Sequence, residues 1–148
     1  MKMSVTEVYL DTNVIVGLFT VDPLSALAEA ILSADPVVVF VSDLALAECA
    51  SVLARRVRMA ELTREEAKQA FIRQDEWMQN FANITTIQPS DIADAARFIR
   101  RLDLNLRLQD AIHIATAMRT GTLLATFDVK MAESAVKLGC PILEIKQN

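Results

Sequence analysis

Short apolar runs alternate along the chain with longer segments in which apolar residues recur every three to four positions. The short runs predict buried strands, at residues 5–10, 37–41, 84–87, 123–127 and 142–145. The longer segments predict amphipathic helices, which begin near residues 14, 22, 43, 63, 89, 108 and 129. This alternation predicts an α/β fold with a mainly parallel sheet. No repeat, low-complexity tract or linker interrupts the pattern, so we expect residues 1–148 to form a single domain.

The hydrophobic content is high, at 53%, but it is not arranged as a membrane span. The longest apolar run, residues 37–41, is far too short to cross a bilayer. The N-terminal residues lack the basic start and long apolar core of a signal peptide, so we expect a cytoplasmic protein. Apolar residues along the 63–81 helix exceed what one small core needs, which predicts a homodimer and a protein partner.

The charge of the chain is weakly acidic overall and unevenly distributed. A net charge of −4 excludes a generic basic nucleic-acid-binding protein. Residues 1–54 hold seven acids and one base, whereas residues 55–148 hold twelve acids and fourteen bases. One group of arginines precedes Asp110 and consists of Arg97, Arg100, Arg101 and Arg107. These side chains are candidates for phosphate contacts, or they are the solvated face of a helix.

Four acids occupy positions that suit a shared site. Asp11 and Asp128 directly follow predicted strands, at the sheet edge where parallel α/β proteins bind ligands. Glu48 lies in an apolar helical stripe, and no base within a turn of the helix is available to satisfy its charge. Asp110 opens a helix rich in small residues, which can approach the sheet closely. Clustered carboxylates repel one another, and Mg²⁺ or Mn²⁺ relieves that repulsion.

Each acid also has an ordinary interpretation. Asp11 and Asp128 could simply cap the helices that follow them. Glu48 could lie exposed at the edge of its stripe, and Asp110 could pair with Arg107 three residues earlier. His113 is the only histidine, and it has no triad or metal-ligand spacing around it. Because it faces the same side as Asp110, it could support the acidic site, but we expect it to be a hydrogen-bonded structural residue.

Four segments, in order along the chain, resemble the motifs of the PIN-domain ribonucleases, and the VapC toxins of toxin–antitoxin pairs above all. They are Leu-Asp-Thr-Asn-Val (10–14), Ala-Glu-Cys (47–49), Gln-Asp-Ala-Ile-His-Ile-Ala-Thr-Ala (109–117) and Ala-Thr-Phe-Asp (125–128). The resemblance implies a three-layer sandwich, with helices on both faces of a parallel sheet, and Mg²⁺- or Mn²⁺-dependent hydrolysis of RNA. It also implies a small antitoxin partner.

The same resemblance assigns roles to individual residues. By motif position, the acidic catalytic and metal-binding set is Asp11, Glu48, Asp110 and Asp128. Asn13 and Thr126 match polar positions that help to orient these acids. No acidic position departs from the family pattern, so the expected function is that of an active ribonuclease toxin.

Two other functions fit parts of the sequence. A haloacid-dehalogenase-type phosphatase also begins with a strand that ends in Asp-x-Asp, but position 13 is Asn and no later lysine and Asp-Asp motif follows. A non-catalytic interaction module with the PIN fold would keep the apolar surface, but it would have no reason to keep all four acids.

Overall fold

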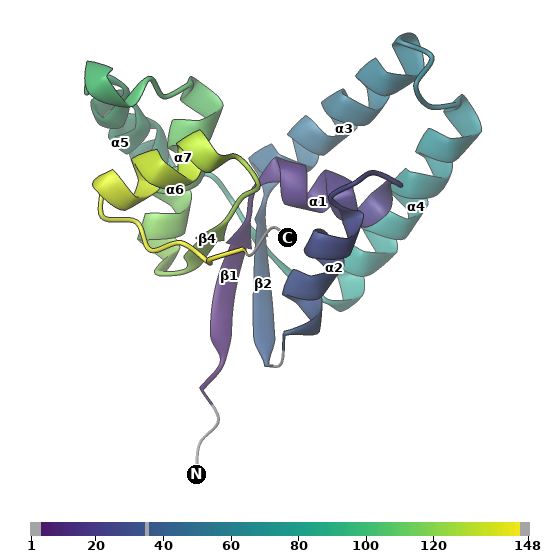
Figure 1. Cartoon of the computed structure of the whole chain (residues 1–148), viewed down its shortest axis with the longest axis horizontal. Helices are drawn as coiled ribbons and strands as arrows, with labels where there is room; N and C mark the ends of the chain where they lie inside the picture. The colour runs from purple at the N-terminus through teal and green to yellow at the C-terminus, as the bar shows by residue number, and fades with distance from the viewer. Residues whose placement is uncertain (1–3, 35, 146–148) are drawn as a thin grey trace.

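The computed structural model describes residues 4–34 and 36–145 and forms three layers. In chain order the elements are β1 (Thr6–Leu10), α1 (Thr12–Phe19), α2 (Ser25–Ser33), β2 (Val37–Ser42), α3 (Asp43–Arg58), α4 (Arg64–Asn80), β3 (Ala82–Thr85), α5 (Pro89–Ile99), a 3₁₀ turn (Leu102–Leu104), α6 (Leu108–Thr120), β4 (Leu123–Ala125) and α7 (Val129–Lys137). Helices α1–α4 lie on one side of the strands and α5–α7 on the other (Figure 1). The α/β three-layer prediction is confirmed.

The sheet is parallel, with strand order β3-β2-β1-β4. Strand β1 therefore lies between β2 and β4, and its last three residues, Val8 to Leu10, are buried on both faces. Val8 and Leu10 belong to the core formed with α1–α4, whereas Tyr9 belongs to the core formed with α6 and α7. The carboxyl ends of β1 and β2 point to where the two groups of helices diverge (Figure 1).

Local sequence signals fix the boundaries of several helices. Ser42 ends β2 and caps α3 by accepting a hydrogen bond from the backbone N–H of Ala45. Thr63 and Glu66 form a capping box at the start of α4, as their spacing predicts. Gly121 ends α6 with a φ of +68°, in the left-handed region that glycine adopts without strain. Within the described ranges, no helix is both long enough and apolar enough to cross a membrane.

Four predictions about element bounds are wrong. The strand predicted at 123–127 ends at Ala125. The second helix begins at Ser25 rather than directly after Asp22, because the Asp22 carboxylate accepts a hydrogen bond from the backbone N–H of Leu24 and holds a turn there. The third strand is Ala82–Thr85 rather than 84–87, since its pairing with β2 starts where α4 ends. Residues 142–145 form no strand, and only Ile142 makes an isolated parallel bridge, to Leu124.

Candidate functional site

The structure brings the four predicted acids to one cavity at the carboxyl edge of the sheet. Asp11 follows β1, Glu48 lies on α3, Asp110 lies in the first turn of α6, and Asp128 joins β4 to α7. All four line a cavity of about 290 Å³, together with Arg56 of α3. Right-handed crossovers in a parallel sheet place such residues on the same edge, so the convergence follows from the topology.

Asp11 is both a helix cap and part of this cavity. Its Oδ1 accepts a hydrogen bond of 2.8 Å from the backbone N–H of Thr12, at the start of α1. Its Oδ2 accepts a hydrogen bond of 2.7 Å from the hydroxyl of Thr126. Asp128 likewise caps α7 by accepting a hydrogen bond from the N–H of Met131 at Oδ1. Capping and a position in the cavity are therefore compatible for both residues.

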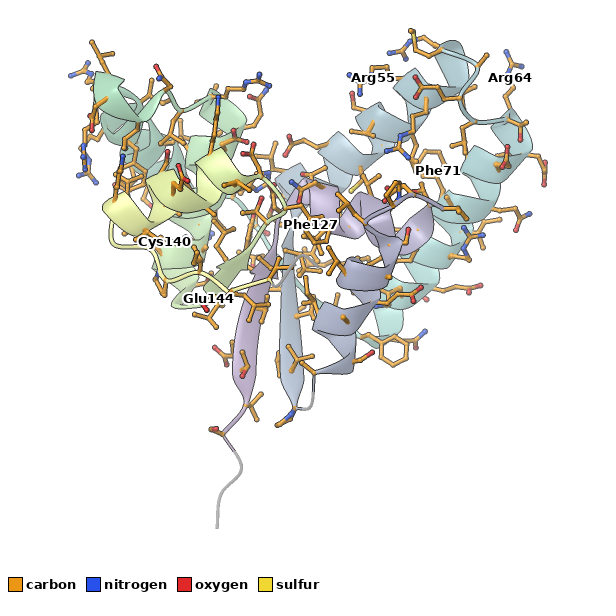
Figure 2. All side chains as sticks on the ribbon, in the orientation of Figure 1. Arg55, Arg64, Phe71, Phe127, Cys140 and Glu144 are labelled. Carbon is orange, nitrogen blue, oxygen red and sulfur yellow. The ribbon has the colours of Figure 1, made fainter. Side chains whose placement is uncertain are left out.

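Asn13 and Thr126 connect the turns after β1 and β4. The Asn13 amide donates to the hydroxyl of Thr126 over 3.3 Å, and its carbonyl accepts from the backbone N–H of Phe127 over 3.2 Å. The same hydroxyl accepts from the N–H of Asp128. Phe127 lies beside α1 (Figure 2) and packs against the core on that side of the sheet. Both polar residues thus hold Asp11 and Asp128 in place.

Glu48 meets a base that comes from another helix. Its Oε1 accepts hydrogen bonds from the hydroxyl of Thr12, at 3.1 Å, and from Nε2 of His113, at 2.5 Å. His113 is 1% exposed, and its other ring nitrogen lies 2.5 Å from the hydroxyl of Tyr9. The interpretation of His113 as a hydrogen-bonded, buried residue agrees with this geometry. No local pattern points to Tyr9, because it lies 104 positions from His113.

The cavity holds more negative charge than its bases offset. Burial and then the charges of Asp11 and Asp128 raise the pKa of Asp110 to about 6. Burial also raises the pKa of Asp11, even though His113 and Thr126 favour its ionised form. Burial alone would lower the pKa of His113, but the hydrogen bond to Glu48 and the nearby acids outweigh it and raise that pKa. Arg107 makes no ion pair with Asp110 in the described part of the chain.

The donor set of the cavity suits a hard divalent cation. Among the described residues, no hydrogen bond engages Oε2 of Glu48, Oδ2 of Asp128 or either carboxylate oxygen of Asp110. Carboxylate oxygens are the ligands that Mg²⁺ and Mn²⁺ prefer. Across residues 4–34 and 36–145, however, no group of three or more His, Cys, Asp or Glu side chains is already arranged to hold a metal ion. Some of the four carboxylates would have to change rotamer to share one.

The arginines before Asp110 occupy different environments. Arg97 pairs with Asp94, and Arg101 pairs with Asp103, both at the surface. Arg100 is also exposed, at the end of α5. Arg107 differs from these three, because it lines a second cavity.

That second cavity continues the first. It has a volume of about 430 Å³, shares Asp110 and Asp128 with the acidic cavity, and is also lined by Arg107, Lys130 and Lys137. The sequence pattern did not single out these two lysines, because they lie on α7, well separated from the arginines along the chain.

The profile of the PIN domain matches residues 8–137, which include all four acids. The chain belongs to the PIN domain family. Membership of this family, together with the sheet order, excludes the alternative of a haloacid-dehalogenase-type phosphatase. A comparison with curated protein sequences found no match.

Solved structures show the same PIN fold at low sequence identity. Mycobacterium tuberculosis VapC20, described as a sarcin-ricin loop cleaving toxin, is 18% identical with a TM-score of 0.70, over 86% of this chain and 94% of that one. A chain of the Rickettsia felis VapBC2 complex with promoter DNA is 13% identical, with a TM-score of 0.68, over 95% and 100%. A chain of FitAcB from Neisseria gonorrhoeae is 21% identical, with a TM-score of 0.66, over 93% and 96%.

Proposed function

We propose that this PIN domain is a metal-dependent endoribonuclease and the toxin of a type II toxin–antitoxin pair in the cytoplasm. The observation that carries the proposal is the convergence of Asp11, Glu48, Asp110 and Asp128 on one cavity, where burial and then the charges of Asp11 and Asp128 raise the pKa of Asp110 to about 6. Carboxylates in such an arrangement destabilise a fold unless a cation joins them. The likeness to VapC20, described as a sarcin-ricin loop cleaving toxin, supports the same reaction class.

In this proposal the four carboxylates hold Mg²⁺ or Mn²⁺. The bound metal would supply a water molecule of lowered pKa and would offset the charge that grows on the phosphate. Thr126 and Thr12 hold Asp11, and Thr12 and His113 hold Glu48. The chain's contribution is thus to fix the positions of the acids before substrate arrives, which is the usual requirement for such sites.

The substrate path in this proposal runs along the two connected cavities. Arg56 lines the acidic cavity, and Arg107, Lys130 and Lys137 line its continuation beyond Asp110 and Asp128. Bases on either side of the acids would contact phosphates that flank the cleaved bond. Arg97 and Arg101 already have acidic partners, whereas Arg107 lines the second cavity. Among the four arginines, Arg107 is therefore the one that we expect to contact a phosphate.

We propose further that residues 1–148 act as one domain, form a homodimer and bind an antitoxin. A groove of about 500 Å³ lies between the end of α1 and the α3–α4 hairpin. It is lined by the apolar residues Phe19, Leu62 and Ala70, by Arg56 and Arg73, and by the acids Asp22, Glu61, Glu65 and Glu66. An extended or helical peptide with apolar anchors suits such a groove. Structures of toxin–antitoxin complexes among the similar folds support this partner class.

The test is cleavage of total RNA by purified protein that is free of any partner. We expect cleavage with Mg²⁺ or Mn²⁺, its loss in excess EDTA, and cut ends that map to a small number of sites when sequenced. Asp128→Asn should abolish cleavage without preventing RNA binding. RNA binding without cleavage under every metal condition would favour the non-catalytic interaction module. Equal cleavage with and without EDTA would refute metal dependence.

A further inference from the structure

Tyr9, His113 and Glu48 form a continuous chain of hydrogen bonds from the protein interior to the acidic cavity. We propose that Tyr9 and His113 are positioning residues, which hold one carboxylate oxygen of Glu48 so that the other faces the cavity and can bind a divalent cation. The inference rests on the proposed function, because it takes Glu48 to be a metal ligand. It adds to the site Tyr9, which the sequence does not single out, and gives a role to His113, which lies within the motif at 109–117.

The chain of contacts forms a ring that begins and ends on α3. Ser42, the N-cap of α3, lies 2.8 Å from the hydroxyl of Tyr9 on the central strand. That hydroxyl lies 2.5 Å from Nδ1 of His113 on α6, and Nε2 of His113 lies 2.5 Å from Oε1 of Glu48, six residues beyond Ser42. The ring therefore fixes α3, β1 and α6 relative to one another. Glu48 is the member of the ring that lines the cavity, and Nε2 of His113 also lies 3.8 Å from Oδ1 of Asp11.

Hydrogen-bond chemistry sets the direction of the last contact. An ionised carboxylate only accepts, so Nε2 of His113 carries the proton that bonds to Glu48. The Tyr9 hydroxyl donates its one proton to Ser42, so it accepts from Nδ1, and both ring nitrogens of His113 carry a proton. Tyr9 thus fixes the orientation of the ring, and the ring fixes Glu48.

The burial of Tyr9, His113 and Glu48 distinguishes this positioning role from that of a core histidine that only has its hydrogen-bonding groups satisfied. Tyr9 is fully buried and His113 is 1% exposed, whereas the Glu48 side chain is 28% exposed. The hydroxyl of Thr12 converges on the same oxygen, Oε1, as His113 does. Two donors on one oxygen hold the carboxylate in a single rotamer. In the described part of the chain, Oε2 accepts no hydrogen bond, which leaves it available to a cation in the cavity.

Two substitutions of His113 separate positioning from packing. In His113→Gln the side-chain amide nitrogen lies near the place of Nε2, so a donor to Glu48 is kept. In His113→Asn the shorter side chain reaches only the place of Nδ1, so the bond to Glu48 is lost. Tyr9→Phe removes just the hydroxyl that orients the ring. Thr116→Val is the matched control, because its buried hydroxyl on the same helix bonds only to the carbonyl of Ile112.

The measurement is Mn²⁺ affinity of the intact protein, titrated by electron paramagnetic resonance, with thermal melting in EDTA to show that each variant folds. Removing a residue that orients a metal ligand costs about 10- to 100-fold in metal affinity. We therefore expect a loss of about tenfold or more for His113→Asn, a smaller loss for Tyr9→Phe, and near-wild-type affinity for His113→Gln and Thr116→Val.

Several results would overturn the inference. A folded His113→Asn with wild-type affinity would do so, as would equal losses for the Asn and Gln variants. If His113→Asn fails to fold, Tyr9→Phe decides the matter, and unchanged affinity there refutes the positioning role. Glu48→Gln separates this inference from the proposed function. If only Glu48→Gln lowers the Mn²⁺ affinity, Glu48 is a metal ligand but Tyr9 and His113 do not position it. If Glu48→Gln leaves the Mn²⁺ affinity unchanged, Glu48 is not a ligand, and the positioning role is refuted as well.

Discussion

The hydroxyl of Thr126 donates a 2.7 Å hydrogen bond to Oδ2 of Asp11, across 115 positions of sequence. The two residues meet because β1 and β4 are adjacent parallel strands, in which Leu10 is paired with Ala125. The backbone N–H of Asp11 also bonds to the carbonyl of Ala125, at 2.9 Å. Two distant turns are therefore held as one unit, and the acids of the site depend on it.

We predict that Thr126→Val lowers stability and that Thr126→Ser does not. Valine keeps the volume but removes the hydroxyl that Asp11, Asn13 and the N–H of Asp128 share. An unsatisfied buried polar group costs about 1–3 kcal/mol, so the free energy of unfolding in urea should fall by about this amount. Equal stability of the Ser and Val variants would show that the hydroxyl of Thr126 does not stabilise the fold.

A second prediction concerns Asp110→Asn in metal-free protein. The change keeps the shape of the side chain and removes one of the repelling charges. Because the side chain is only half-buried, solvent screens the repulsion, and we expect the gain in stability at pH 7 to be of order 1 kcal/mol. Thermal melting in EDTA checks this. A variant that melts below the wild type would contradict a shared acidic site.

Added metal should reverse the order of the melting temperatures of the wild type and Asp110→Asn. A ligand at a hundredfold excess over its Kd stabilises the protein that binds it by about 2.7 kcal/mol. Mn²⁺ should therefore raise the melting temperature of the wild type more than that of Asp110→Asn. An equal gain in both proteins would exclude Asp110 as a ligand.

The third prediction is a pH dependence of the difference between these two proteins in EDTA. The pKa of Asp110 is raised from 3.8 to about 6 in the folded protein, so the folded state takes up a proton before the unfolded chain does. The penalty from its charge is fully present above about pH 6 and is relieved as the pH falls toward 3.8. The advantage of Asp110→Asn should thus shrink between pH 7 and pH 4.5. A constant difference over that range would contradict the raised pKa.

Local patterns were enough to predict most of the fold. The β-branched run before Ser42, the capping box at Thr63 and the glycine at position 121 each act over a few residues, and each marks a boundary that the structure reproduces. The failures occurred where distant partners decide. Residues 142–145 have the composition of a strand, but only Ile142 finds a partner across the sheet edge.

The candidate site was predictable in its acids but not in its supporting contacts. Asp11 and Asp128 were recognisable because they follow predicted strands, and Glu48 because no base lies near it on its helix. Neither signal required knowledge of the residues that contact them. The Tyr9–His113 contact and the ion pair of Asp91 with Arg119 join residues 104 and 28 positions apart. No local spacing reveals such pairs, because the tertiary fold alone brings them together. Asp91, for example, is fully buried, although its place in a first helical turn suggests only a favourable interaction with the helix dipole.

A fourth prediction concerns the ion pair of the buried Asp91 with the partly exposed Arg119. Arg119 donates two hydrogen bonds to Asp91, from Nε at 2.8 Å and from Nη2 at 3.0 Å. Arg119→Met keeps an apolar stem but leaves the Asp91 carboxylate with the backbone N–H of Gln88 as its remaining donor, which costs about 1–3 kcal/mol. The control is Arg97→Met, which breaks only a surface pair with Asp94 and should cost less than about 1 kcal/mol. Urea unfolding of the two variants measures the contrast, and equal losses would contradict it.

The fifth prediction tests the second cavity as a phosphate-binding path. Arg107→Gln and Lys130→Gln should each weaken RNA binding and reduce its dependence on salt, because each lost phosphate contact lowers the slope of log K against log salt by about 0.7 for a single strand. Arg97→Gln should leave the slope unchanged, since that side chain lies at the surface beside Asp94. Binding to catalytically inactive Asp128→Asn protein gives the slopes. Identical slopes for all variants would place the RNA elsewhere.

The position of β1 between β2 and β4 also governs when the cavity can exist during synthesis. Asp11 leaves the ribosome early, yet the neighbouring strand β4 and Thr126 are translated more than a hundred residues later. A nascent chain that stops before residue 123 carries Asp11, Glu48 and Asp110 but has neither β4 nor Asp128 to close the edge of the sheet. The order of strands therefore delays assembly of the acidic cavity until almost the whole polypeptide has been made.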